Sequence, residues 1–174
     1  MSLGLTTLTP DEGSIHLPDL IALLVDSVDN GASVGYLAPM DAEMAHKYWQ
    51  GVIDAVAGGD RVLWLATLDG AVVGTAQLSL ERRPNGDHRG EVSKVLVHSS
   101  ARRKGIGRAL MAAIEARARA EQRTLLVLDT VEGDAGERLY ESIGYVSAGA
   151  IPNYAKSSNG GYDPTNVMYK VLKT

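Results

Sequence analysis

The spacing of apolar residues predicts two helices near the start of the chain. Apolar residues recur at helical spacing in one segment that stops at Asn30-Gly31, a typical helix end. Its apolar positions are Leu17, Leu20, Ile21, Leu24, Val25 and Val28. A second helix is expected from about Asp41, a suitable N-cap residue, to Ala57, where two glycines follow. A short strand is expected before both helices, from Leu3 to Leu8.

The middle of the chain has the pattern of an antiparallel meander. Apolar runs from Arg61 to Leu68 and from Ala71 to Leu80 predict two strands, and Asp69-Gly70 between them is a strong hairpin signal. The next turn, Pro84 to Asp87, leads into a third strand from about Arg89 to Val97.

The segment after this meander predicts a parallel crossover. From Gly105 onward, apolar side chains fall on one face of a predicted helix and charged side chains on another, so the helix is expected to pack on a sheet. A strand that looks buried follows from Thr124 to Asp129. An order of strand, helix and strand with these lengths is typical of parallel pairing.

The remaining segments predict a short helix and two strands. The helix is expected from Ala135 to Ile143, before Gly144, and the strands from Tyr145 to Ile151 and from Thr165 to Leu172. The Ser157 to Gly161 segment between the strands has the composition of a mobile loop. We see no repeat or linker, and we expect residues 1–174 to form one domain.

Composition excludes several classes of protein. A formal net charge of −4 and a pI near 5.5 argue against nucleic acid as a partner. Without cysteine, the chain forms no disulfide, thiolate zinc site or cysteine nucleophile. The four histidines lack metal-ligand spacing, so no metal is predicted. Since no segment resembles a signal peptide or approaches the ~18 apolar residues of a spanning helix, we expect no membrane partner and a cytoplasmic location.

The chemistry of the chain is concentrated where the third strand of the meander enters the crossover helix. Arg102, Arg103, Lys104 and Arg108 are cationic, and Gly105 and Gly107 allow a close approach to the backbone. The first N–H groups of a helix lack intrahelical partners and carry positive potential, which favours an anion. This turn and the first helical residues, Ile106 and Ala109 included, therefore predict a phosphate-binding site.

Other interpretations of this turn fit less well. A Walker loop requires a lysine after its glycines, whereas Lys104 precedes them, and the dinucleotide fingerprint requires a third glycine that is missing after Gly107. A solvated helix start remains an alternative. Cations are unfavourable at a helix N-terminus unless an anion meets them, which favours the ligand site.

Two separated motifs resemble the GNAT superfamily of N-acetyltransferases. Arg102-x-x-Gly105-x-Gly107 matches the acetyl-CoA pyrophosphate signature, and the segment Leu139 to Tyr145 stands in register with it. The resemblance implies the GNAT α/β (α+β) fold: a mixed, largely antiparallel sheet of about seven strands with a splayed strand pair and flanking helices. It also implies acetyl-CoA as co-substrate.

Within this superfamily, the chain resembles the tabtoxin resistance acetyltransferases. The segments that carry this resemblance are Gly31 to Tyr36, Ala76 to Ser79, Pro84 to Gly86, Glu91-Val92, Lys94, Ser100 to Arg102 and Leu128 to Thr130. The resemblance covers most of the chain and is weaker near the N-terminus and after Pro152. Substrate-side loops diverge quickly, so it supports the fold and the cofactor better than the substrate.

The family resemblance also implies roles for particular residues. Backbone groups of about Val95, Leu96 and Val97 would hold the pantetheine arm and the acetyl oxygen, although these residues could equally be ordinary buried strand positions. Tyr140 matches the general acid that protonates the departing thiolate, whereas a tyrosine on a short helix is otherwise more often a core residue.

Two carboxylates are candidates for work on the acceptor amine. Glu91 and Asp129 stand near the ends of strands expected to flank the cleft. Either could act as a base through water, bind the ammonium group as a counter-ion, or be a surface carboxylate.

The sequence thus predicts direct transfer of an acetyl group from acetyl-CoA to a primary amine in a ternary complex. The expected acceptor is a small molecule such as an amino acid or an amino-acid-like antibiotic or toxin. Two alternatives stay open: an acetyltransferase for a protein N-terminus or lysine, and a CoA-binding module without turnover. The choice between monomer and homodimer also stays open.

Overall fold

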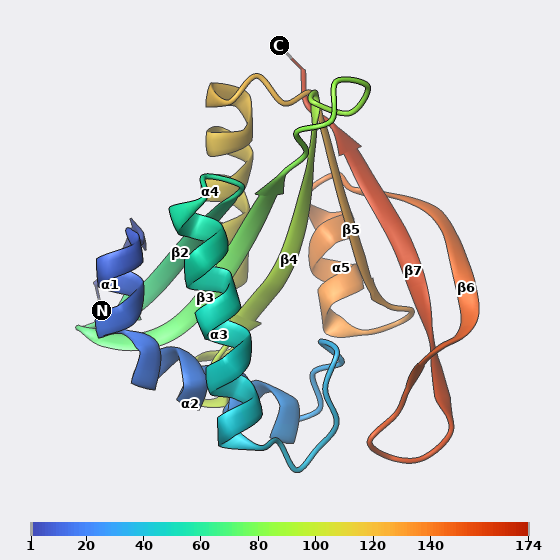
Figure 1. The fold of residues 1–174 in the computed structure, drawn as a ribbon. Coiled ribbons are helices and arrows are strands. Elements are labelled where there is room, and N and C mark those ends of the chain that lie inside the picture. The colour runs from blue at the N-terminus through green and yellow to red at the C-terminus, as the bar shows by residue number, and fades with distance from the viewer. Residues whose placement is uncertain (1, 174) are drawn as a thin grey trace.

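The computed structural model describes residues 2–173 and shows the predicted order of elements with one addition, a short first helix (Figure 1). The helices are α1 (Pro10–Ile15), α2 (Leu17–Asp29), α3 (Ala42–Ala57), α4 (Ile106–Ala120) and α5 (Ala135–Ser142), with a 3-10 turn η1 (Ser99–Ala101). Sequence reasoning missed α1, although its start carries a strong signal. Thr9 and Glu12 form a capping box, and Pro10 occupies the first turn.

The strands form one mixed sheet. They are β1 (Leu3–Thr7), β2 (Arg61–Leu68), β3 (Ala71–Leu80), β4 (Arg89–Val97), β5 (Leu125–Val131), β6 (Val146–Lys156) and β7 (Tyr162–Val171). Within residues 2–173 the sheet has seven strands in the order β1-β2-β3-β4-β5-β7-β6. Of the pairs described, β4 with β5 is parallel and the others are antiparallel, which confirms the predicted fold class.

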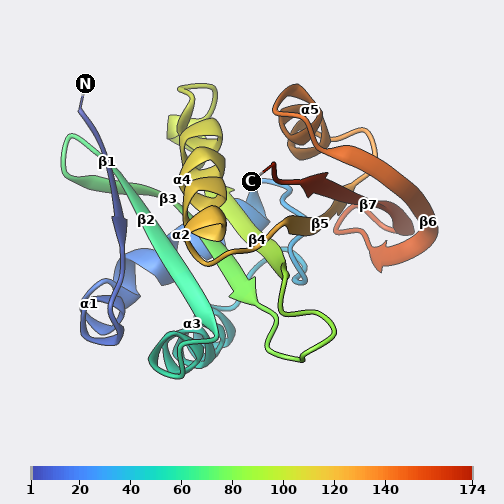
Figure 2. The ribbon, with the colours of Figure 1, turned by 90° about the horizontal axis from the view of Figure 1, so that it is seen from above.

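Helices cover both faces of the sheet, as Figure 2 shows from above. On one face, α4 and Tyr140 of α5 pack over a core that includes Trp64, Leu78 and Val92. On the opposite face, α2 and α3 pack over Leu63 and Leu65. Alternate residues of one strand therefore serve different cores, as the two-residue period of a strand requires.

The parallel strands β4 and β5 separate along their length. Their ladder in the described chain consists of Arg89 with Leu125, Gly90 with Leu126 and Glu91 with Val127. Beyond these pairs β4 stays on β3 and β5 stays on β7, and Figure 1 shows the two strands diverging. The splayed pair leaves backbone groups of β4 facing an opening rather than a neighbouring strand.

The last two strands are longer than the sequence predicts. β6 and β7 pair antiparallel out to Lys156 and Tyr162, so the predicted loop is the short connection at the tip of a long hairpin. Gly149 and the Ile151 to Ala155 segment interrupt the register, which hides the strand pattern in the sequence. No helix within residues 2–173 is long and apolar enough to cross a membrane.

Candidate active site

Two cavities lie beside the opening between β4 and β5. A large cleft of about 980 Å³ lies between β4, the turn before α4, and α5. A smaller cavity of about 270 Å³ lies between β4, β5, the α2–α3 connection and the β6–β7 hairpin. We call them the cofactor cleft and the acceptor cavity. The volume of the cofactor cleft is at the upper end of the range typical of ligand pockets, and the volume of the acceptor cavity is just below the lower end.

The N-terminus of α4 forms one wall of the cofactor cleft and is built for an anion. Gly105 is its N-cap residue with φ of +80°, a left-handed conformation that glycine adopts without strain. No side chain caps this end of the helix in the described chain. The first amide N–H groups of α4 therefore stay available to a ligand, together with the positive end of the helix dipole.

Most predicted cofactor residues line this cleft. They are Val95, Leu96, Val97, Arg102, Arg103, Gly105, Ile106, Gly107 and Arg108. Lys104 and Ala109 do not line it. Arg138 of α5 also lines the cleft, with Nη1 donating to Gly133 O at 2.7 Å. Sequence reasoning missed Arg138 because the chain gives no sign that α5 lies opposite the α4 N-terminus.

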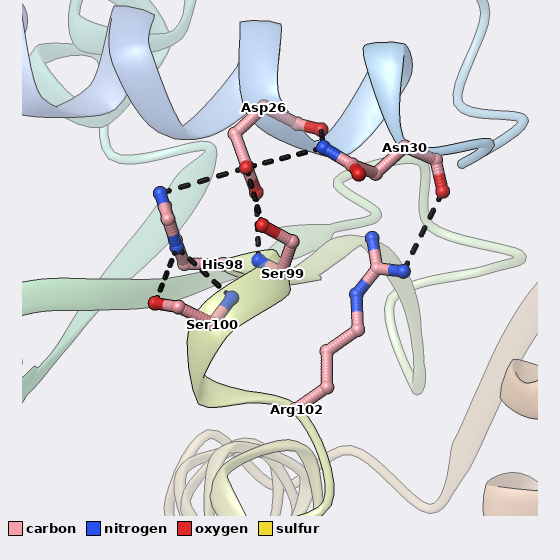
Figure 3. A network of polar contacts seen from close by, with 6 residues as sticks. All are labelled: Asp26, Asn30, His98, Ser99, Ser100 and Arg102. Carbon is pink, nitrogen blue, oxygen red and sulfur yellow. Dashed lines mark hydrogen bonds and ion pairs between the residues drawn. The ribbon is translucent and has the colours of Figure 1, made fainter.

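The turn before α4 is fixed to the opposite face of the sheet by a polar network (Figure 3). Asp26 of α2 accepts hydrogen bonds from Ser99 N at 2.7 Å and from Ser99 Oγ at 2.6 Å. Its Oδ1 also lies 3.5 Å from His98 Nε2. Arg102 Nη1 donates to Asn30 O, at the end of α2, at 3.5 Å. The basic turn is thus held in place before any ligand binds, which reduces the entropy cost of binding.

Two different structural features explain why positions 105 and 107 of the turn hold glycine. Gly105 needs its left-handed backbone, and an added Cβ there would meet nothing within 4 Å. At Gly107, an added Cβ would stand 3.0 Å from Leu139 Cδ2, which is closer than ordinary van der Waals contact. Gly107 therefore allows α4 and α5 to approach each other, in addition to any role toward a ligand.

Tyr140, the residue predicted to be the general acid, is a buried residue of the cofactor cleft. Its side chain is only 8% exposed, and it lines the cofactor cleft together with Val95 to Val97. No residue of the described chain makes a hydrogen bond to its hydroxyl. Burial, with smaller contributions from Asp134 and Asp129, raises the pKa of Tyr140, so the phenol stays protonated and able to donate.

The two candidate carboxylates occupy different places. Asp129 lines the acceptor cavity, and its Oδ2 accepts a hydrogen bond from Thr165 Oγ1 at 3.1 Å. Glu91 lies in the last residue pair of the β4–β5 ladder, is exposed, and lines neither cavity. The structure brings Asp129 to the opening between the strands and leaves Glu91 at its closed end.

Lys94 is a cavity residue to which sequence reasoning gave no role. It lines the acceptor cavity and adopts a left-handed φ of +49°, where the register between β3 and β4 shifts. This conformation costs a non-glycine residue on the order of 1 kcal/mol. Lys94 Nζ lies 5.4 Å from the centre of the Tyr48 ring, and burial lowers the pKa of Lys94. Asp129 and Glu91 act against this lowering, and Arg61 adds to it.

The α2–α3 connection and the β6–β7 hairpin close the acceptor cavity from outside. Ser33, Val34 and Gly35 come from the connection, and Tyr154 and Ala155 come from the hairpin. The two segments are linked where Ala38 N donates to Ser158 Oγ at 3.0 Å. The acceptor cavity is therefore a small site bordered by these two segments.

The described residues contain no group of three or more His, Cys, Asp or Glu side chains placed to hold a metal ion. The absence of a metal stays a prediction of the sequence.

Comparison with known proteins gives one family. The model of the acetyltransferase (GNAT) family matches residues 27–145. A sequence relative, described as an uncharacterised N-acetyltransferase of Azospirillum brasilense, is 34% identical over 122 residues, or 69% of this chain and 70% of that protein. The segment that the family model matches, residues 27–145, contains α3, the splayed strands, the basic turn and Tyr140.

Solved structures share the whole architecture. A ribosomal-protein-alanine N-acetyltransferase from Brucella melitensis has a TM-score of 0.78 and 27% identity, over 97% of this chain and 99% of the other. A candidate acetyltransferase from Salmonella typhimurium, solved with its cofactor acetyl-CoA, has a TM-score of 0.80 over 100% of this chain and 96% of the other. At 18% identity, the second likeness shows the fold alone.

Proposed function

The chain belongs to the acetyltransferase (GNAT) family and is an acetyl-CoA-dependent N-acetyltransferase, and we propose that its acceptor is the primary amine of a small molecule. The resemblance to the tabtoxin resistance acetyltransferases favours an amino acid or an amino-acid-like antibiotic or toxin. We also propose that the enzyme is cytoplasmic.

The single observation that carries this proposal is the small size of the acceptor cavity. Its 270 Å³ are bounded by β4 and β5 on one side and by the linked α2–α3 connection and β6–β7 hairpin on the other. A polypeptide acceptor needs an open groove for the residues that flank the reactive amine. A small acceptor can be surrounded by these walls without displacing them.

The cofactor cleft fits acetyl-CoA in its chemistry. The uncapped N-terminus of α4, with Arg102, Arg103 and Arg108, suits the pyrophosphate. The backbone of Val95 to Val97, which has no strand partner on the β5 side, suits the pantetheine arm. Acetyl-CoA supplies the acetyl group as a thioester. Lys94 of the acceptor cavity and Val95 of the cofactor cleft are neighbours on β4, so the two cavities are adjacent. An amine in the acceptor cavity can then attack the acetyl group directly.

We assign the proton transfers to residues on the two sides of this opening. The ammonium group must lose one proton before its nitrogen can attack, and the nitrogen releases a second proton to water once the new bond to carbon has formed. The thiolate gains one proton as the bond to sulfur breaks. Asp129 in the acceptor cavity accepts from the ammonium group, directly or through water, and Tyr140 in the cofactor cleft donates to the sulfur. Glu91, which lies at the closed end of the opening and lines neither cavity, takes no part in these proton transfers.

An acceptor screen tests the proposal. We expect free amino acids and β-lactam amino acids to be acetylated with a specificity constant at least a hundredfold above those of peptides, polyamines and aminoglycosides. A tenfold difference amounts to only about 1.4 kcal/mol and could come from one contact. If a peptide N-terminus wins by a hundredfold, the acceptor proposal is wrong while the acetyltransferase stands. This outcome matters because the Brucella protein is named a ribosomal-protein-alanine N-acetyltransferase.

A thermal-shift measurement separates binding from turnover. Acetyl-CoA at a hundredfold excess over its dissociation constant should stabilise the protein by ~3 kcal/mol. Stabilisation without thioester cleavage across the amine panel would instead support a CoA-binding module.

A further inference from the structure

Lys94 carries a positive charge at a place where the structure offers it no ion pair. The ion pairs within residues 2–173 include neither Lys94 nor Arg61, although the two cations are close enough to affect each other. The neighbour that holds the ammonium group is the Tyr48 ring, at 5.4 Å. An aromatic face orients a cation and leaves its N–H groups free for an anion.

Two hydrogen bonds that involve Gln77 also fix the position of Tyr48. Gln77 Nε2 donates to Tyr48 Oη at 2.9 Å, and Arg61 Nη1 donates to Gln77 Oε1 at 3.1 Å. Arg61 Nε is buried without a hydrogen-bond partner in the described chain, so this end of the network has donors and lacks an acceptor. A row of polar groups from β2 and β3 through α3 thus supports one cation at the wall of the acceptor cavity.

The backbone at Lys94 adds a separate argument. The left-handed backbone of Lys94 suits glycine or asparagine better than lysine. Backbone preference therefore does not explain why this position holds a lysine. Strained backbone at a cavity wall is a reason to look for a function of the side chain. Lys94 of β4 lines the same cavity as Asp129 of β5, so the two residues lie on the two strands of the splayed pair.

We propose that Lys94 binds the carboxylate of the acceptor while Asp129 faces its ammonium group, so that the acceptor cavity selects a zwitterionic amino acid. The inference rests on the proposed function and names a residue that decides specificity within it. A carboxylate and an amine on neighbouring atoms would bridge the two charged walls of a cavity of 270 Å³. A monoamine without an acid group would leave Lys94 desolvated and unpaired, which disfavours its binding.

The depressed pKa of Lys94 agrees with this role. Burial lowers it, Arg61 lowers it further, and Asp129 from β5 and Glu91 from β4 raise it. Tyr48 from α3 faces the same ammonium group, and burial raises the pKa of Tyr48 to about 12, so the ring stays neutral. An incoming carboxylate supplies the negative charge that the lysine lacks.

The test compares an amino acid with its carboxamide, which keeps the amine and removes the acid. For the wild type we expect a clear preference for the acid in kcat/KM. Lys94→Gln should lower kcat/KM for the acid by 10- to 100-fold, mainly through the acceptor KM, and leave the carboxamide within threefold. Lys94→Arg, which keeps the charge, should retain most of the preference. The KM for acetyl-CoA should not change in either variant.

The comparison is internal to each variant, so the different basicity of the two amines cancels between wild type and Lys94→Gln. Equal losses for acid and carboxamide would show that Lys94 only supports the fold of the cavity, and the proposal would fall. Lys94→Asn, which tolerates the left-handed backbone, provides a second variant if Lys94→Gln does not fold. An unchanged preference in a folded variant overturns the role of Lys94 alone, whereas a peptide preferred in the acceptor screen overturns the acceptor class as well.

Discussion

The cofactor cleft and the acceptor cavity are built from the same pair of splayed strands but from different kinds of sequence. The basic side of the cofactor cleft is almost continuous, from Val95 through the turn to Arg108, with α5 added across it. The acceptor cavity gathers short segments from the α2–α3 connection, β4, β5 and the final hairpin. One half of the site is local in the chain, and the other exists only once distant segments have met.

This difference separates what binds a common ligand from what selects a particular one. A helix N-terminus with a glycine turn binds phosphate by backbone geometry, which varies little among sequences. A cavity between loops gains its shape from side chains and connections that change without loss of the fold. The following variants test whether the two halves act as separately as their construction suggests.

The largest effect is expected for Tyr140→Phe. The variant removes one oxygen from a side chain that is 8% exposed, so packing and acetyl-CoA affinity should be preserved. Turnover should fall by a factor on the order of 10² to 10⁴, because the departing thiolate loses its proton donor. Single-turnover kinetics at saturating acetyl-CoA measure the chemical step. Turnover within a few-fold of the wild type would make Tyr140 a core residue only.

On the acceptor side, Asp129→Asn and Glu91→Gln form a matched pair. We expect Asp129→Asn to lose about 10² in turnover, with the loss easing at high pH, where the amine is already free of its extra proton. Glu91→Gln should stay within about threefold, since Glu91 lines neither cavity. Rate profiles between neutral and alkaline pH measure both. A larger loss in Glu91→Gln would reverse the assignment, and a pH-independent loss in Asp129→Asn would indicate damage to positioning.

A smaller effect is expected for Arg138→Ala, on the cofactor side. Removing this cation from the cleft should weaken acetyl-CoA binding by about tenfold, or ~1.4 kcal/mol, and leave the ratio of acid to carboxamide acceptors unchanged. Arg117→Ala is the control, because Arg117 pairs with Glu121 at the far end of α4. Calorimetric titration with acetyl-CoA measures the affinity. Equal weakening in both variants would reflect net charge and not the cleft.

The smallest effect, a coupling energy of about 1 kcal/mol, concerns the packing of Gly107 against Leu139. Gly107→Val should destabilise the protein by about 1 to 2 kcal/mol, because its side chain would meet Leu139. Adding Leu139→Ala should recover part of this loss, so that a double-mutant cycle gives a coupling of about 1 kcal/mol. Denaturant unfolding measures it. Strict additivity would mean that Gly107 is required by the ligand and not by α5.

Much of the fold was predictable because its signals are local. The hairpin at Asp69-Gly70 and the strands on either side have the predicted bounds, and Asp41 caps α3 as expected. The α1 helix was not predicted, although the capping box of Thr9 and Glu12 is a local signal for its start. The extension of β6 and β7 could not be found in this way, because bulges and pairing between distant residues define it.

By itself, the sequence determined the order of elements and the family, and it located the basic glycine turn that is predicted to bind phosphate. Each of these depends on neighbours in the chain: hydrophobic period, turn residues, and the uncapped start of α4. Only the tertiary structure decided that Asp129 enters the acceptor cavity and Glu91 does not, that Arg138 lies across from the turn, and that Lys94 carries an unpaired charge. These facts depend on where β4 and β5 part and on which loops close over them, and such contacts join residues that are far apart in sequence.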